Sequence, residues 1–198
     1  MKINTSTSVV VRIVLWLLML LGGAIIAINI DKNSPLFQSY LFHTISGILG
    51  ILVITLAFRA AANGGRELTK GRVGNIPRLE TNRLVTSGIY SCMRHPMLFG
   101  LTLLPLGWAL LLGSPTFITI IAPLEMLFII FMVLVFEEME VKRKFKDAYE
   151  TYKKDVPLVS FKRNCLHELF KSKKVSLIFQ HSHYTKKHQL SLLKKFWL

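Results

Sequence analysis

An arginine, a histidine and a proline stand together at Arg94-His95-Pro96, directly before an apolar run at residues 97–112. Pro96 fits the first turn of a helix and pushes His95 out of helical geometry. Arg94 and His95 would then lie beside a helix N-terminus, where a guanidinium, an imidazole and free N–H groups suit a carboxylate or another anion. The alternative is a basic anchor that contacts lipid phosphates, and the residues alone favour neither.

Two carboxylates, Glu137 and Glu138, follow another apolar run at residues 117–136. At a membrane edge these carboxylates could bind a cation. Glu138 has Lys142 four residues on, at the spacing of an intrahelical ion pair, whereas Glu137 has no base at that spacing. The pattern therefore makes Glu137 the better functional candidate of the two.

The two runs that border these residues are joined only by Gly113-Ser114-Pro115. Helices connected this tightly are antiparallel neighbours. The hairpin would bring the arginine–histidine pair and the glutamate pair to the same membrane face. A zwitterionic ligand, with a carboxylate and a positive group, would fit that arrangement.

Four apolar runs could cross a membrane, which takes about 20 mostly apolar residues for a helix. The sequence therefore predicts an all-α, multi-pass bundle of about four spans. We expect the first run to be a retained span and not a cleaved signal. The third run is short, and we expect a full but thin span, with a re-entrant segment as the alternative. The runs are residues 13–30, 36–58, 97–112 and 117–136.

The chain of 198 residues is 52% hydrophobic and only 18% charged, with a net charge of +14, which excludes a disordered protein. Residues 59–96 carry net +5 and residues 137–198 carry net +8. With four spans, both regions and the N-terminus share one side, which is cytoplasmic by the positive-inside rule. This placement explains the charge without a nucleic-acid partner. We expect the membrane to be that of the endoplasmic reticulum if the protein is eukaryotic and the cytoplasmic membrane if it is bacterial.

The only two cysteines, Cys92 and Cys165, fall on this predicted cytoplasmic side. Because that compartment is reducing, we expect two free thiols. Two cysteines also cannot supply a four-ligand zinc site by themselves, and we expect no metal site.

An amphipathic helix is predicted directly after residue 136, continuing the fourth run into the cytoplasm and ending near Pro157. Its apolar residues recur every three or four positions: Val141, Phe145, Ala148, Tyr149 and Tyr152. We divide the chain into a membrane core at 1–158 and a basic cytoplasmic tail at 159–198. The tail ends in an amphipathic anchor at 190–198 and contains His181, His183 and His188, for which adventitious metal binding is expected.

The chain from about residue 69 to 157 resembles the integral-membrane methyltransferases typified by isoprenylcysteine carboxyl methyltransferase, with phospholipid methyltransferases as relatives. The family pattern is Leu-Val-x-x-Gly-x-Tyr, then Arg-His-Pro-x-Tyr-x-Gly, a hairpin, Glu-Glu, Phe-Gly-x-x-Tyr-x-x-Tyr and Val-Pro. The matching segments are LVTSGIY at 84–90, RHPMLFG at 94–100, EE at 137–138, FKDAYETY at 145–152 and VP at 156–157. Leu98 stands where the family has Tyr, and Lys146 stands where it has Gly.

The resemblance implies S-adenosylmethionine as cofactor, bound at the cytoplasmic end of the hairpin. His95 and Pro96 would line it, Glu137 and Glu138 would meet its polar groups, and Arg94 would serve the cofactor carboxylate or the acceptor. Arg94 and His95 would be the catalytic pair. The matched motif positions Tyr90, Gly100 and Tyr149 complete the cofactor-binding set that the resemblance implies.

The implied activity is methyl transfer to a lipophilic acceptor, a prenylated protein or a lipid, in contact with membrane lipids. A prenylcysteine carboxylate is the first candidate, and because a carboxylate is already ionised it needs no strong base. A phospholipid amine or a small thiol is the alternative, for which His95 is the nearest group to remove a proton. A non-catalytic membrane scaffold or ligand binder is the third reading, and Leu98 favours it.

Overall fold

The computed structural model describes residues 5–74 and 81–171, and within these ranges the chain is helical with no strand. This confirms the predicted all-α class. The α-helices are α1 (Thr5–Asp31), α2 (Tyr40–Leu68), α3 (Pro96–Thr102), α4 (Leu104–Leu112), α5 (Ala122–Met132), α6 (Glu138–Asp155) and α7 (Arg163–Phe170). Short 3₁₀ turns are η1 (Thr69–Gly71) and η2 (Gly88–Ser91), and π-turns are η3 (Phe117–Ile121) and η4 (Val133–Glu137).

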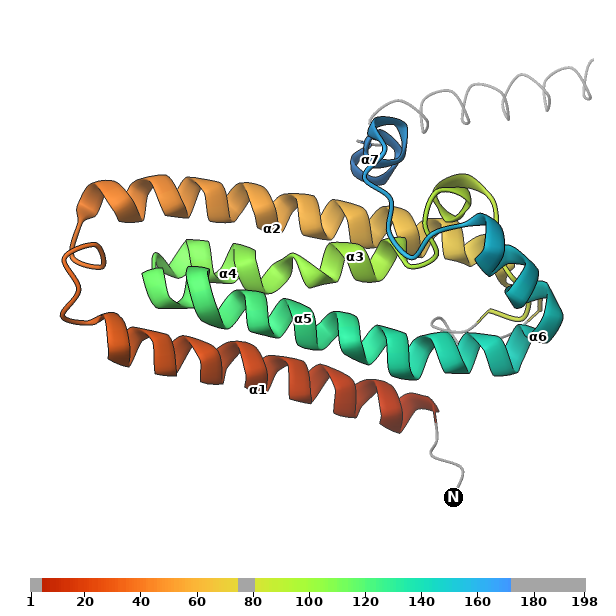
Figure 1. Ribbon diagram of the computed structural model, residues 1–198, viewed down its shortest axis with the longest axis horizontal. Coiled ribbons are helices and arrows are strands. Elements are labelled where there is room, and N and C mark those ends of the chain that lie inside the picture. Colours follow the sequence, from red (N-terminus) through yellow and green to blue (C-terminus); the bar gives the residue numbers. More distant parts are fainter. Residues whose placement is uncertain (1–4, 75–80, 172–198) are drawn as a thin grey trace, which may run out of the picture.

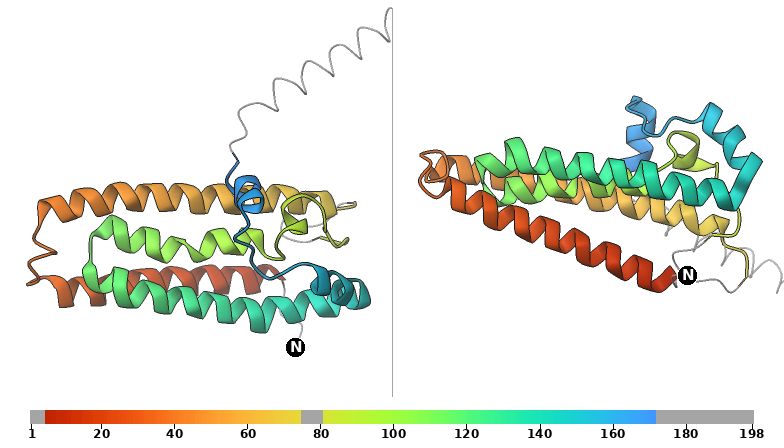
Figure 2. Two further views of the ribbon diagram at one scale, coloured as in Figure 1. Left: turned by 45° about the horizontal axis from the view of Figure 1, so that its top comes forward. Right: turned by 60° about the horizontal axis from the view of Figure 1, so that its bottom comes forward.

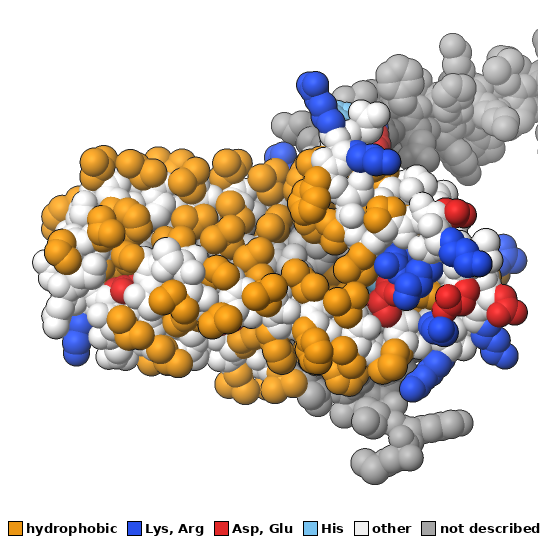
Figure 3. All heavy atoms as spheres, viewed as in Figure 1, with side chains coloured by type: hydrophobic (Ala, Val, Ile, Leu, Met, Phe, Trp, Pro, Cys, Tyr) orange, Lys and Arg blue, Asp and Glu red, His pale blue; other side chains and the backbone are white. Residues whose placement is uncertain are grey.

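The helices form an elongated bundle in which α3 and α4 lie between α2 and α5 (Figure 1). The start of α1, the C-terminal end of α2, and helices α6 and α7 gather at one end in every view (Figure 2). Figure 3 shows apolar side chains along the flank and charged side chains at the end that carries α6 and α7. The predicted grouping of these segments at one face is therefore confirmed, while the side of the membrane stays a prediction.

Three helical stretches are long and apolar enough to cross a membrane, namely Val14–Asp31, Tyr40–Gly71 and Phe117–Asp155. The third predicted span, Pro96–Leu112, is shorter, and its 17 residues extend roughly 25 Å against a hydrocarbon core of about 30 Å. The helix is also interrupted between α3 and α4. Pro105 explains the interruption, because it lacks an N–H and its ring crowds the carbonyl four residues before it. Whether this stretch crosses fully stays a prediction.

Two glycines let α3 approach α2 and so fix the position of the residues before α3. A Cβ on Gly64 of α2 would come within 2.7 Å of the Met97 backbone nitrogen. A Cβ on Gly100 of α3 would come within 2.6 Å of the Ala57 carbonyl oxygen. Any larger residue would push the two helices apart, and Arg94 and His95 would move with α3.

The opposite end of the hairpin is fixed by Asp31, the last residue of α1, which is 4% exposed. Its carboxylate accepts a hydrogen bond from the Thr116 backbone N–H at 2.9 Å and from the hydroxyls of Ser114 and Thr116. An anion suits this position because the next helical turn begins there with free N–H groups. The turn between α4 and η3 is thereby tied to α1.

The helix that leaves the bundle turns back sharply at Lys146, within α6. Lys146 has φ 46° and ψ −124°, and it is the only non-glycine residue with positive φ among those described. The prediction that the fourth run continues into a further helix ending near Pro157 is confirmed, because η4 leads directly into α6, which ends at Asp155. The helical periodicity did not predict the reversal, which falls at the position where the family pattern has glycine.

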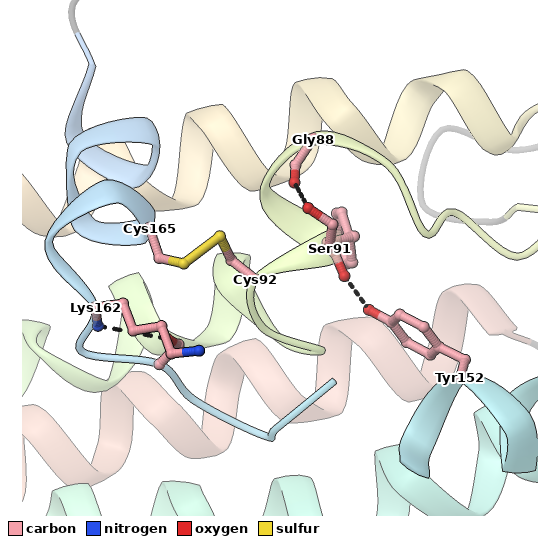
Figure 4. The surroundings of a disulfide bond; sticks show 8 residues. Gly88, Ser91, Cys92, Tyr152, Lys162 and Cys165 are labelled. Carbon is pink, nitrogen blue, oxygen red and sulfur yellow. Dashed lines mark hydrogen bonds between the residues drawn. A yellow bond between two sulfur atoms is a disulfide. The ribbon is translucent and has the colours of Figure 1, made fainter. Parts of the chain in front are cut away.

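The two cysteines form a disulfide, with 5.7 Å between their Cα atoms, so the expectation of two free thiols is wrong (Figure 4). An apolar cluster that includes Met93 and Leu169 packs η2 against α7 and brings Cys92 beside Cys165. The expectation rested on the compartment alone, and a spacing of 73 residues gave no hint that the two cysteines meet.

Helix α7 belongs to the predicted basic tail but packs on the core, with Leu169 fully buried. The division of the chain at residue 158 stays a prediction. The predicted amphipathic anchor at 190–198 and the three histidines from His181 to His188 lie outside the described residues.

Replacing Lys146 with glycine should raise the free energy of unfolding by about 1 kcal/mol, because glycine adopts positive φ without the steric cost that lysine has there. The matched control is Lys144→Gly, which removes the same charge from a helical position and should cost about 1 kcal/mol. Thermal unfolding in detergent, followed by tryptophan fluorescence, measures both changes. Destabilisation by both substitutions would contradict the reversal at Lys146.

Candidate active site

The centre of the candidate site is the carboxylate of Glu138, the first residue of α6, whose side chain is 8% exposed. Arg94 Nη1 donates to both of its oxygens, at 2.9 and 2.6 Å. His95 Nε2 lies 2.8 Å from Oε1, and the Tyr149 hydroxyl donates to the same oxygen at 2.5 Å. Lys153 Nζ lies 3.2 Å from Oε2. The predicted meeting of the arginine–histidine pair with the glutamate pair is therefore confirmed as geometry.

Two departures from a regular helix bring these groups to Glu138. The π-turn η4 (Val133–Glu137) ends directly before it, and one extra residue in a turn rotates all that follows by about 100°. The reversal at Lys146 then returns the chain, because 11 residues of straight helix would separate Tyr149 from Glu138 by about 16 Å. Without the reversal, neither Tyr149 nor Lys153 could reach the carboxylate.

The sequence pattern favoured Glu137 over Glu138 as the functional candidate, whereas the structure places Glu138 at the centre of the cluster. Lys142, the expected neutralising partner of Glu138, instead pairs with Glu150 at 2.7 Å, across the reversal. Glu138 is thus left for Arg94 and His95 and becomes the buried member of the pair. Glu137 is 29% exposed, and its Oε2 lies 3.8 Å from His95 Nδ1. The imidazole therefore lies between two carboxylates.

The surroundings of His95 set its protonation. Burial lowers the pKa of His95 below its ordinary value of 6.5, against the opposing effect of the hydrogen bond with Glu138. At pH 7 the ring is therefore neutral. Because the Glu138 carboxylate can only accept, Nε2 must carry the hydrogen, and Nδ1 is left as a proton acceptor facing Glu137. A neutral imidazole that is held by one carboxylate at Nε2 and carries no hydrogen on Nδ1 can act as a general base.

Arg94 is held from two sides, and its Nε–H is left without a partner among the described residues. Its backbone N–H bonds to the Pro157 carbonyl at 3.1 Å, and its side chain is 10% exposed. Its Nε is buried with no hydrogen-bond partner in the part of the chain that the structure describes. A buried donor without a partner is costly, which makes this N–H a position for an acceptor atom of a ligand.

The remaining predicted site residues, Tyr90, Pro96 and Gly100, pack next to the cluster and do not contact the Glu138 carboxylate. The Tyr90 ring belongs to the apolar cluster with Met93, and its carbonyl accepts from the Tyr152 hydroxyl at 2.6 Å (Figure 4). Pro96 is fully buried at the start of α3, and Gly100 faces α2. Their predicted parts in cofactor binding stay predictions. Their observed contacts are those of residues that position Arg94 and His95.

Sequence reasoning did not single out Lys153 or the disulfide as parts of this region. The contact of Lys153 depends on the reversal at Lys146, which a helical pattern does not reveal. Tyr152 and Tyr149 share one helical face by their spacing. That spacing, together with the matched Tyr-x-x-Tyr motif, did identify both tyrosines, but not their partners Glu138 and the Tyr90 carbonyl.

Comparison with family models places residues 42–148, just over half of the chain, in the family of phospholipid methyltransferases. The matched region runs from α2 to shortly after the reversal, and it contains Arg94, His95, Glu137 and Glu138. It agrees with the predicted resemblance to membrane methyltransferases without resolving the acceptor. No curated protein and no solved structure matches the chain.

Glu138→Gln should lower the free energy of unfolding by about 3–5 kcal/mol, because it leaves the Arg94 guanidinium buried without its counter-charge. Glu140→Gln, an exposed change two positions on, should stay within about 0.5 kcal/mol of the wild type. Denaturant titration in mixed micelles would compare the three proteins. Equal stability of the Glu138 variant and the wild type would show that this carboxylate does not hold the site together.

His95 should make the stability of the protein fall as the pH drops below about 6.5. Since the pKa of His95 is lower in the folded chain, the unfolded chain takes up the proton first, and the free energy of unfolding declines until the folded pKa is passed. His95→Gln should flatten this part of the profile. His167→Gln, which removes an exposed histidine outside the cluster, should keep it. Parallel profiles for wild type and His95→Gln between pH 7 and 5 would contradict the lowered pKa.

Proposed function

Since the chain belongs to the phospholipid methyltransferase family, we propose that it transfers a methyl group from S-adenosylmethionine to a lipophilic acceptor at the membrane surface. The first candidate acceptor is the amine headgroup of a phospholipid. The observation that carries this choice is the buried, neutral His95 fixed by Glu138, with its Nδ1 available to take a proton.

The charges of the cluster suit S-adenosylmethionine, which carries a carboxylate, an ammonium group and a sulfonium. The unpartnered Nε of Arg94 offers a buried donor for the carboxylate. Glu137, partly exposed and beside His95, offers negative charge for the cationic groups. When bound, the cofactor supplies a methyl group made electrophilic by its positively charged sulfur. The residues present therefore fit this group.

His95 would serve the acceptor by removing a proton. A phospholipid amine is protonated in neutral water, with a pKa near that of lysine at about 10, and a protonated amine has no lone pair to donate. Nδ1 of His95 can accept that proton, and the resulting imidazolium would lie between Glu137 and Glu138. A positioned base of this kind contributes typically about 10²–10⁴-fold to rate.

The position of the cluster suits an acceptor that stays in the membrane. Exposed apolar side chains continue along α5 and η4, with Phe131 57% and Phe136 48% exposed, up to the residue before Glu137. Charged residues begin immediately after them (Figure 3). A lipid could therefore keep its chains against α5 while its headgroup reaches His95. We propose that this end faces the cytoplasm, as the excess of positive charge indicates.

The second candidate acceptor is the carboxylate of a prenylated cysteine. The motif at residues 84–100, which resembles that branch most closely, favours it. The two acceptors make different demands on His95, because a carboxylate is already ionised and an amine or thiol is not. Loss of His95 should therefore affect carboxylate methylation much less.

Transfer of a labelled methyl group by purified protein in lipid nanodiscs would test the proposal, with phosphatidylethanolamine, a prenylcysteine and a small hydrophobic thiol as acceptors. We expect transfer to phosphatidylethanolamine, reduced roughly 10²–10⁴-fold by His95→Gln and unchanged by Glu140→Gln. Transfer to prenylcysteine that survives His95→Gln would select the second candidate. Folded protein that methylates none of the three, and does not bind S-adenosylmethionine in a calorimeter, would overturn the proposal in favour of a scaffold.

A further inference from the structure

A groove of about 470 Å³ lies on the flank of α2 near the charged end of the bundle, where the end of α7 meets it. It shares no lining residue with the cluster around Glu138. One half of the groove is apolar and the other half is basic. This division is the pattern of a site for an amphiphile.

The apolar half is a stripe along α2 made by Ile54, Phe58 and Ala62, spaced four residues apart on one helical face. Phe58 is 59% exposed, although it is a large aromatic residue. The stripe continues toward the middle of the helix through Ile51 and Ile48, which are 60% and 65% exposed. In a membrane this surface lies against lipid chains.

The basic half is formed by Arg59 and Arg66 of α2 and by Lys171, directly after α7. Lys171 is paired with Glu168 at 3.2 Å. Together with that glutamate, the three basic side chains therefore carry a net charge of +2. Arg59 has no hydrogen-bond or ion-pair partner among residues 5–74 and 81–171. Two uncompensated cations beside an apolar stripe suit an anionic phosphate group with a hydrocarbon chain.

The end of α7, which carries Lys171 into the groove, is held against α2 by specific contacts. Asn63 Nδ2 donates to the carbonyls of Leu169 at 2.6 Å and Lys171 at 3.1 Å, at the end of α7. Arg66 donates to the Asn63 side-chain oxygen, which orients the amide for these bonds. The disulfide described above ties the same helix to the loop before α3 (Figure 4). The groove therefore depends on the docking of α7.

We propose that this groove binds one membrane phospholipid with an anionic headgroup, at a site separate from the methyl-transfer cluster. The phosphate lies between Arg59 and Arg66, and an acyl chain follows the stripe from Phe58 toward Ile48. Free phosphate would leave the apolar half in contact with water or bulk lipid, and a headgroup without net charge would leave the cations uncompensated. The occupant is therefore a bilayer lipid and not a soluble anion.

Native mass spectrometry of the full chain, released from detergent after incubation with defined lipids, would test this site. We expect retention of one dioleoyl phosphatidylglycerol in preference to dioleoyl phosphatidylcholine. The double variant Arg59→Gln/Arg66→Gln should weaken retention by roughly tenfold or more. The matched control, Arg143→Gln/Arg163→Gln, removes two exposed arginines outside the groove and should retain the lipid as the wild type does.

A second variant, Phe58→Ala, leaves every charge in place and should also weaken retention, because it removes the centre of the apolar stripe. Equal retention of the two lipids would overturn the proposal. So would equal losses in the groove variant and the matched control, or competition by inorganic phosphate at the same concentration as the lipid.

Discussion

The structure depends on one buried carboxylate, that of Glu138, and on the cationic and hydrogen-bonding groups that keep it charged. An ionised carboxylate at 8% exposure is stable only when it is paired and hydrogen-bonded on both oxygens. Arg94 and His95 come from the start of α3, and Tyr149 comes from the part of α6 beyond the reversal. Two regions distant in sequence, the residues before α3 and helix α6 on both sides of its reversal, are therefore required to meet at one point, at the border between the apolar flank and the charged end. The same requirement places an imidazole where it is shielded from water and fixed in one tautomer.

Much of this arrangement could be predicted from the sequence. The lengths of the four apolar runs predicted the all-α class. The short Gly113-Ser114-Pro115 turn predicted a helical hairpin that brings Arg94 near Glu138. The rest depended on irregular backbone. A helical pattern assigns Lys142 to Glu138, because pattern reasoning assumes a regular helix. Because of the π-turn and the reversal at Lys146, Glu138 instead pairs with Arg94 and His95, and Lys142 pairs with Glu150.

The departure at Lys146 illustrates how a family pattern can carry conformational information that is visible only once the backbone is known. Glycine in the family pattern matches a residue with φ 46°, and this chain meets the same demand with a residue that has a Cβ. The cysteines illustrate the opposite case, because their partnership depends on the tertiary packing of α7. With that helix docked, one end of the bundle carries both the Glu138 cluster by α5 and the basic groove on α2, which we propose as two separate sites for amphiphiles.

The central claim, that α6 folds back so that its second half meets Glu138, is tested most directly by zero-length cross-linking of carboxylates to lysines, read by mass spectrometry. The account predicts amide links between Lys142 and Glu150 and between Lys153 and Glu138, whose charged atoms lie 2.7 and 3.2 Å apart. In a straight helix the two pairs would be separated along the axis by roughly 12 and 22 Å. The pair Glu67–Lys70, at 2.5 Å within α2 and η1, is the positive control. A link in the control pair with neither of the other two would contradict the account.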